Sequence, residues 1–137
     1  MNGWPPGNPA SDMKIVLIER FLAMAADEAF VVAQPSTPAS YFHLLRQHSL
    51  GEEHKPMIVF TPKSMLKRKE AASQPHDFTE GTFQPVLPDL TADASAVSRV
   101  LLCSGKIYYD LLAERTKSER TDVAIVRSDF DRSASRS

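Results

Sequence analysis

Two short apolar runs are each followed directly by a helix-starting sequence, and this repeat constrains the fold more than any other feature. Phe30 to Ala33 precedes Gln-Pro-Ser-Thr-Pro, and Met57 to Phe60 precedes Thr-Pro-Lys-Ser. A hydroxyl side chain caps the first turn of a helix, and proline is preorganised for the first helical position. Because parallel strands need a crossover of a dozen or more residues, this order predicts an α/β fold with mainly parallel strands and flanking helices.

Apolar periodicity predicts the other elements. Four prolines or glycines occur in the first seven positions, so we expect an irregular lead-in over residues 1–13, in which Ser11 or Asp12 caps the following helix. The predicted helices cover residues 14–26, 38–50, 62–72 and 107–118, and the predicted strands cover 30–33, 57–60, 99–103 and 122–127.

Composition divides the chain into two incomplete modules. Residues 73–93 are polar and rich in proline, and only residues 82–87 among them could form an extended segment. The expected division is a first α/β module at 14–72, a linker at 73–81, a second module at 82–127 and a disordered tail at 128–137. Two partial sheets leave open edges and apolar faces, which predicts a partner subunit or a second copy that covers them.

Charge and composition exclude several classes of function. The chain has 16 basic and 17 acidic residues, a net charge of -1, and lacks the broad positive field that nucleic-acid binding requires. No apolar run is long enough to cross a membrane, and the first residues lack the features of a signal peptide, so we expect a cytoplasmic protein. The single cysteine, Cys103, lies in the apolar run Val-Leu-Leu-Cys, which favours a small buried hydrophobe over a nucleophile.

Three groups of residues offer unspecific anion sites. A basic cluster is either a solvated helix face or an anion contact, and two strand-to-helix turns either present amides to an anion or simply cap a helix. These groups are Lys63 with Lys67, Arg68 and Lys69; Ser104 with Gly105 and Lys106; and Thr61 with Lys63 and Ser64.

The histidines do not form a metal motif. His43 and His48 are five positions apart and therefore on different sides of a helix, and no carboxylate stands at ligand spacing from the four histidines, which are His43, His48, His54 and His76. His43 beside Leu44 is a core histidine more often than a catalytic base. Because no nucleophile elbow, zinc motif or kinase signature is present either, we predict no catalytic, cofactor-binding or metal-binding residue.

Longer runs of the sequence carry a family resemblance. Between Ile18 and Arg127 the segments IERFL, QPSTPASYFHLLRQ, KPMIVFTPKSMLKRK, VLLCSGKIYYDLLAER and DVAIVR resemble the C-terminal part of the thiamin diphosphate dependent decarboxylating component of the 2-oxoglutarate dehydrogenase complex, in its multifunctional actinobacterial form. The resemblance implies a transketolase-like fold, in which residues 14–72 end the pyrimidine-binding domain and residues 82–127 begin the C-terminal domain. It also implies the family's chemistry, in which 2-oxoglutarate is decarboxylated on thiamin diphosphate with magnesium in the tricarboxylic acid cycle.

The chain departs from the family where the family has functional residues. Met13 stands where the resemblance places a substrate-contacting histidine, and Leu17 where it places an arginine. The family's acetyl-CoA activator positions also lack basic residues here, with Arg46 the nearest match; they read Val31, Gln47, Thr82, Pro85 and Phe130. We therefore expect neither the substrate contact nor the activator site in this chain.

These observations predict a fragment of a 2-oxoglutarate dehydrogenase or decarboxylase without catalytic activity alone. The alternative is an interaction module that docks on the full-length enzyme or on another α/β subunit. A third hypothesis is an anion-binding or CoA-binding module that uses Lys63, Lys67 and Arg68.

Overall fold

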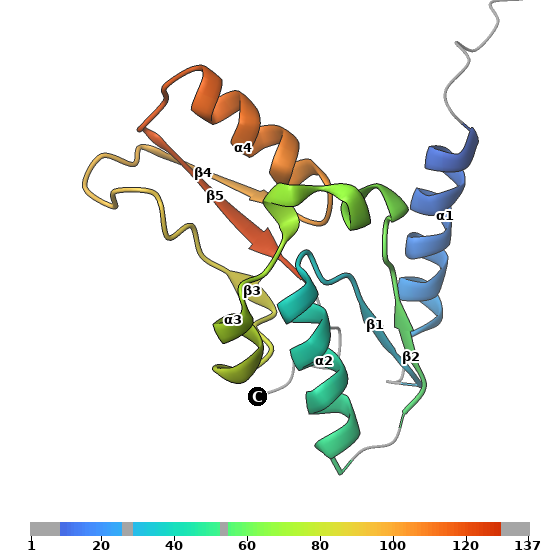
Figure 1. Ribbon diagram of the computed structural model, residues 1–137. Helices are drawn as coiled ribbons and strands as arrows, with labels where there is room; N and C mark the ends of the chain where they lie inside the picture. The colour runs from blue at the N-terminus through green and yellow to red at the C-terminus, as the bar shows by residue number, and fades with distance from the viewer. Residues whose placement is uncertain (1–8, 26–28, 53–54, 130–137) are drawn as a thin grey trace, which may run out of the picture.

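Two small sheets, each flanked by helices, make up the fold (Figure 1). The computed structural model describes residues 9–25, 29–52 and 55–129. The α-helices in this part of the chain are α1 (Pro9–Met24), α2 (Pro38–Leu50), α3 (Pro75–Thr79) and α4 (Ile107–Lys117), and two 3-10 helices are η2 (Lys63–Lys67) and η3 (Lys69–Ala71). The strands are β1 (Val31–Ala33), β2 (Met57–Val59), β3 (Val86–Leu87), β4 (Arg99–Cys103) and β5 (Val123–Ser128).

The first sheet is the parallel pair β1 and β2, and α2 is the crossover between them, as the repeat of strand, cap and proline predicts. Thr37 caps α2 by accepting a hydrogen bond from the Ser40 amide at 3.1 Å, with Pro38 in the first turn. Leu44 of α2 packs with Ala33 of β1 and with Phe83, and these three side chains form the core of this side. The α1 helix lies on the other side, where the ring of Phe21 contacts the rings that flank the two strands.

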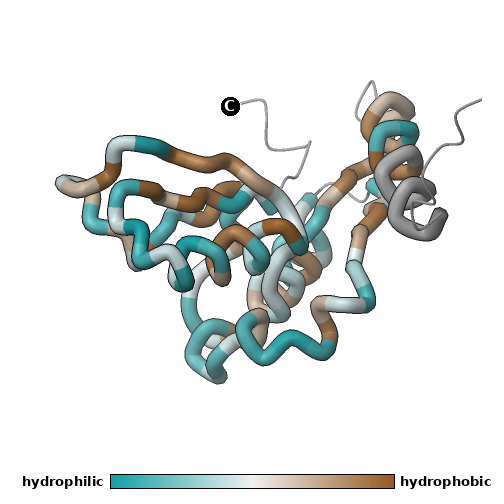
Figure 2. The backbone as a smooth tube through the Cα atoms, turned by 90° about the horizontal axis from the view of Figure 1, so that it is seen from above, coloured by the Kyte–Doolittle hydropathy of each residue, from teal (hydrophilic) through white to brown (hydrophobic). Residues whose placement is uncertain are grey.

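The second sheet has the strand order β3-β5-β4. The β4–α4–β5 unit is parallel, as predicted, and β3 is antiparallel to β5. The Arg127 guanidinium of β5 stacks over the Tyr108 ring of α4 at 4.2 Å, so α4 covers the sheet face that carries Arg127 and, two residues earlier, Ile125. Hydrophobic colour follows the strands in Figure 2, while the connecting segments carry more of the hydrophilic residues.

Helix α1 begins earlier than the sequence indicated. Residues 9–13 are helical, so the prediction of an irregular lead-in over 1–13 is wrong for them, and Ser11 and Asp12 lie inside the helix rather than before it. Pro9 explains the difference, because proline is favourable in a first helical turn that needs no donor there. Residues 1–8 lie outside the described part of the chain.

The predicted helix over residues 62–72 is also wrong. The chain forms two short 3-10 helices instead, and Arg68 between them is extended, with φ -83° and ψ 117°. Neither 3-10 helix has a side-chain cap, and the Arg68 side chain reaches across to Asp110 at 2.6 Å rather than continuing along a helix. A distant contact therefore overrides the local helix signal.

The two segments predicted to lack structure contain ordered residues. The expected linker at 73–81 holds α3, whose Asp77 accepts from the Gln74 amide at 2.7 Å and whose Pro75 occupies the first turn. The expected tail at 128–137 begins with Ser128 in β5 and Asp129, which is fully buried, so the prediction of disorder is wrong at these two positions. The rest of that tail, residues 130–137, lies outside the described part.

No helix in the described ranges is long and apolar enough to cross a lipid bilayer.

Candidate functional site

The carboxyl ends of β1 and β5 meet at a buried polar junction. Asp129, which follows β5, accepts hydrogen bonds from the Ser36 amide at 3.0 Å and from the Ser40 hydroxyl at 2.5 Å. The Tyr109 hydroxyl of α4 donates to the Ser36 carbonyl at 2.7 Å, and Arg127 donates to the Ser36 hydroxyl at 3.3 Å. Every polar group of Ser36 is thus bonded to the second sheet or its helix. Hydrogen bonds to charged groups contribute about 1.5–3 kcal/mol each, so the two bonds that Asp129 accepts form a strong link between the two sheets.

Tyr109 is suited to its role as a donor in this junction. Burial raises the pKa of its phenol, and the nearby Arg127 charge lowers it by a smaller amount. The hydroxyl therefore keeps its proton throughout the neutral range and donates it to the Ser36 carbonyl.

Gly105 closes the same junction from the start of α4. Its φ is +60°, and a Cβ at this position would lie 2.5 Å from Nε2 of Gln34, the residue that follows β1. The turn of Ser104, Gly105 and Lys106, one of the predicted anion sites, is therefore packed against another side chain of the chain itself. Lys106 begins α4 without capping it through its side chain.

The predicted basic cluster is divided in the structure. Arg68 forms an ion pair with Asp110 at 2.6 Å and lies over the Tyr109 ring at 5.7 Å, whereas Lys63, Lys67 and Lys69 are exposed. Thr61 and Ser64 are exposed too, and they precede or occupy a 3-10 helix rather than the start of the predicted α-helix.

His43 is buried in α2, as expected for a core histidine. Its Nε2 donates to the Asp77 carbonyl of α3 at 2.8 Å, and its ring packs against Phe42. His76 is exposed beside Asp77, His48 is half-buried in the last turn of α2, and His54 lies outside the described residues. Among the residues that the structure describes, no group of three histidine, cysteine or acidic side chains could hold a metal ion.

Cys103 is half-buried rather than fully buried at the end of β4. Its Sγ lies 3.7 Å from the Val126 carbonyl. Burial raises the pKa of the thiol, and the charge of Arg127 lowers it by a smaller amount, so the group is a thiol rather than a thiolate at neutral pH. The structure therefore supports the preference for a packing role over a nucleophile.

The positions at which the family resemblance is lost are scattered. Val31 is buried within β1, whereas Arg46, Gln47 and Thr82 are exposed and Pro85 is half-buried. Leu17 is 41% exposed on α1, and Met13 lies in the same helix. Phe130 lies outside the described residues.

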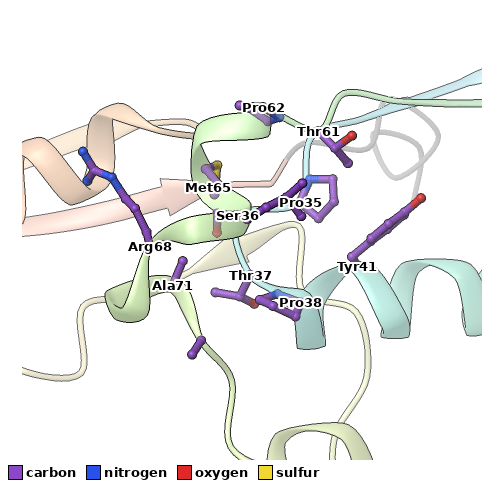
Figure 3. Close-up of a pocket in the computed structure, with 12 residues that line it drawn as sticks. Pro35, Ser36, Thr37, Pro38, Tyr41, Thr61, Pro62, Met65, Arg68 and Ala71 are labelled. Carbon is purple, nitrogen blue, oxygen red and sulfur yellow. The ribbon is translucent and has the colours of Figure 1, made fainter.

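An apolar pocket opens at the carboxyl ends of β1 and β2, where parallel α/β sheets usually place their ligand sites (Figure 3). It has a volume of about 280 Å³. The two proline-rich turns form much of its wall, and the lining residues are Pro35, Ser36, Thr37, Pro38, Tyr41, Thr61, Pro62, Met65, Leu66, Arg68, Ala71 and Ala72. Its single charged side chain, Arg68, is paired with Asp110.

This pocket does not fit thiamin diphosphate with magnesium, the cofactor that the resemblance implies. Its lining contains no carboxylate that could hold a magnesium ion or pair with an aminopyrimidine. Its volume also falls below the roughly 300–1,000 Å³ of pockets that take drug-sized ligands. We therefore derive no step of cofactor chemistry from this pocket.

The residues that join the two sheets are not predicted by the sequence patterns. Asp129 and Tyr109 form the hydrogen bonds of the junction. A second aspartate with a buried side chain, Asp89, accepts a hydrogen bond from the Ile125 amide at 2.8 Å and forms an ion pair with Arg115. The only signal in the sequence was an aspartate directly after a strand, which is a common feature of exposed turns as well.

Comparisons with known proteins agree with the resemblance. A family model described as 2-oxoglutarate dehydrogenase C-terminal matches residues 72–129. The chain is 55% identical over 112 residues to the 2-oxoglutarate dehydrogenase E1/E2 component of Corynebacterium glutamicum. It is 55% identical over 115 residues to the multifunctional 2-oxoglutarate metabolism enzyme of Mycobacterium sp. (strain JLS), and 53% identical over 115 residues to that of Mycolicibacterium vanbaalenii. Each match covers 80% of this chain, and the chain spans about 9% of the length of these relatives. The chain therefore belongs to the 2-oxoglutarate dehydrogenase family and corresponds to a C-terminal part of its members.

Proposed function

We propose that these residues form the joint between two transketolase-like domains of a thiamin diphosphate dependent 2-oxoglutarate dehydrogenase, and that they have no decarboxylase activity alone. Residues 14–72 would end the pyrimidine-binding domain, and residues 82–127 would begin the C-terminal domain. The observation that carries the proposal is the Asp129 junction, which joins β1 to β5 through buried hydrogen bonds.

The polar groups at this junction serve packing rather than chemistry. The Ser36 and Ser40 hydroxyls are bonded to Arg127 and Asp129, and neither has a histidine partner that could activate it as a nucleophile. In the whole enzyme, thiamin diphosphate would supply the electron sink for decarboxylation of the 2-oxo acid. The residues of this chain would hold the two domains in a fixed relation around that chemistry.

Two assays test this proposal. The purified chain, incubated with thiamin diphosphate, magnesium and 2-oxoglutarate, is expected to release no carbon dioxide above the buffer rate, and sustained turnover would overturn the proposal. In the second assay, the chain replaces the matched segment of the Corynebacterium glutamicum relative. We expect a folded chimera that retains decarboxylase activity, because the segment only has to position the rest of the enzyme.

An interaction module is the second candidate, and one observation favours it. Val100 and Leu102 of β4 are 58% and 74% exposed on the sheet face opposite α4, and Val86 of β3 is 52% exposed. In register, Val100 pairs with Ala124, which is buried, and Leu102 pairs with Val126, which is half-buried, so the exposed apolar surface lies mainly on β4. A sheet face of this kind normally packs against another layer.

The interaction module would bind a full-length subunit through this apolar face of β4. Sedimentation of the chain mixed with the intact relative tests it, and we expect co-sedimentation to weaken when Leu102 is replaced by Ser. Leu90→Ser is the matched control, because Leu90 is 90% exposed on the loop before β4. Equal binding by both variants would exclude the β4 face as the docking surface.

In the structure, one of the three residues of the anion-binding or CoA-binding hypothesis is already engaged in other contacts. Arg68 is engaged by Asp110 and Tyr109, which leaves Lys63 and Lys67 as exposed side chains on a short 3-10 helix. We therefore expect saturating acetyl-CoA to leave the melting temperature unchanged.

A further inference from the structure

Another pocket, lined mainly by polar side chains, lies between α2 and α3 on one side and α4 and β5 on the other (Figure 1). Helix α2 contributes Ser40 and His43 to it, α3 contributes Asp77, α4 contributes Tyr108, and β5 contributes Arg127. Its volume is about 420 Å³. Pockets of roughly 300–1,000 Å³ take small molecules, so this pocket is large enough for a small ligand.

The His43 ring places an unused hydrogen-bond acceptor in the wall of this pocket. Its Nε2 donates to the Asp77 carbonyl at 2.8 Å, so Nδ1 of the neutral ring carries no proton and can only accept. Nδ1 is buried and has no partner among the described residues, and His43 as a whole is 6% exposed. Since buried polar atoms are normally hydrogen-bonded, a ligand with an N–H or O–H donor is complementary to this position.

The Arg127 guanidinium places an unused donor in the same pocket. One of its terminal nitrogens donates to the Ser36 hydroxyl at 3.3 Å, and its Cζ lies 4.2 Å from the centre of the Tyr108 ring. Its Nε is buried and has no partner among the described residues. Because a guanidinium N–H binds carboxylates strongly, the group that is complementary to Nε is a carboxylate.

The charge of the pocket wall restricts the ligand further. Three acidic residues line the pocket, Glu70, Asp77 and Glu80, whereas Arg127 is the only lysine or arginine among the described residues that line it. An excess of negative charge opposes nucleotides, CoA and dicarboxylates, because like charges brought together are unfavourable. A ligand that carries one carboxylate and one positive charge avoids this repulsion.

We propose that this pocket binds a free amino acid as its zwitterion. The carboxylate of the ligand accepts from Nε of Arg127, and its ammonium group donates to Nδ1 of His43 and faces the acidic side chains. The apolar part of the ligand lies against Leu87 and Leu112, which line the same pocket.

This site is distinct from the others described above. It goes beyond the proposed function, because a joint between two domains needs no ligand, and the hydrogen bonds of Asp129 hold without one. It also differs from the activator site that the family resemblance implies. Of the positions compared for that activator, only Thr82 lines this pocket, and the proposed contacts do not use it.

Isothermal titration calorimetry of the full chain at neutral pH tests the proposal with two zwitterions, L-leucine and γ-aminobutyrate, in which the charged groups are differently spaced. We expect one-to-one binding of at least one of them. N-acetyl-L-leucine lacks the ammonium group and L-leucinamide lacks the carboxylate, so each should bind roughly tenfold more weakly than L-leucine or not at all. Absence of binding by both zwitterions in the millimolar range would overturn the proposal, and so would equal binding of L-leucine and its two derivatives.

Substitutions then test the two contacts. His43→Gln keeps an N–H near the Asp77 carbonyl but removes the acceptor at Nδ1, and Arg127→Lys keeps the positive charge but removes Nε. Each should weaken binding roughly tenfold. His48→Gln and Arg120→Lys are the matched controls, because neither residue lines the pocket, and both should bind like the unmodified chain. Unchanged binding in both His43→Gln and Arg127→Lys would overturn the proposal, and the ligand comparison decides it even where a substitution impairs folding.

Discussion

The buried pair of Asp89 and Arg115 anchors the loop before β4 to α4 and β5, and its removal gives a quantitative test of the fold. The Asp89 side chain is 4% exposed and the Arg115 side chain 12% exposed. Besides the ion pair, Asp89 accepts from the Ile125 amide at 2.8 Å and from the Thr91 amide at 3.0 Å. Arg115 also donates to the Val123 carbonyl at 3.1 Å.

Asp89→Ala should destabilise the chain severely. It leaves a buried guanidinium without its counter-charge and the Ile125 amide without its acceptor, a situation that costs about 3–5 kcal/mol. Since the total free energy of unfolding of a domain is about 5–15 kcal/mol, the loss is a large part of it. Urea unfolding at pH 7, followed by circular dichroism, measures the difference. A loss below about 1 kcal/mol would refute the assignment of Asp89 as an anchor.

The pH dependence of a second substitution at the same position, Asp89→Asn, provides an internal control. Burial alone would raise the pKa of Asp89, but the hydrogen bonds from Ile125, Thr91 and Arg115 outweigh it and hold the pKa well below its usual range. A carboxyl with a lowered folded-state pKa stabilises the fold above its unfolded pKa of about 3.9, and this stabilisation is lost as the pH falls below that value. The stability gap between the unmodified chain and Asp89→Asn should therefore be full at pH 7 and narrow below about pH 4. A gap that is constant with pH would show that charge contributes nothing.

Two further predictions concern single positions at the end of β4 and the start of α4. Gly105→Ala should lower the free energy of unfolding by about 1–2 kcal/mol through strain at its positive φ, and by a further amount through the clash with Gln34. In thermal unfolding, the double variant Gly105→Ala/Gln34→Ala should regain the stability lost to the clash but not the stability lost to strain. Equal stability of the single and the double variant would exclude the contact. Cys103 should react with a disulfide reagent more slowly than a free cysteine at pH 7, because burial raises the pKa of its thiol more than Arg127 lowers it. Unfolding in urea should restore the ordinary rate. A rate in the folded chain equal to that of free cysteine would contradict this prediction.

Local sequence signals predicted the elements that depend on local physics. The cap and first-turn proline of α2, the parallel β1–β2 and β4–β5 pairs and the bounds of α4 agree with prediction to within a residue or so. These features follow from capping chemistry and apolar periodicity, which act over a few residues.

Long-range contacts account for much of the structure that the sequence patterns do not predict. Arg68 turns toward Asp110, 42 positions later, and the predicted helix over 62–72 breaks at that point. Asp129 looked like the start of a polar tail, and only the approach of Ser36, 93 positions earlier, makes it a buried anchor. In contrast, α3 depends on a local signal, since Gln74, Pro75 and Asp77 form the capping box and first turn, and the predicted linker over 73–81 is wrong at these residues.

The most direct test of the account is hydrogen exchange at the Ser36 amide, because this group donates across the junction to Asp129. In the unmodified chain we predict strong protection of the Ser36 amide. In Asp129→Ala its protection should fall by roughly 10- to 100-fold, the equivalent of one lost hydrogen bond to a carboxylate, while amides in the β4–β5 ladder keep theirs. Unchanged protection of Ser36 in Asp129→Ala, with the ladder intact, would contradict the claim that this carboxylate joins the two sheets.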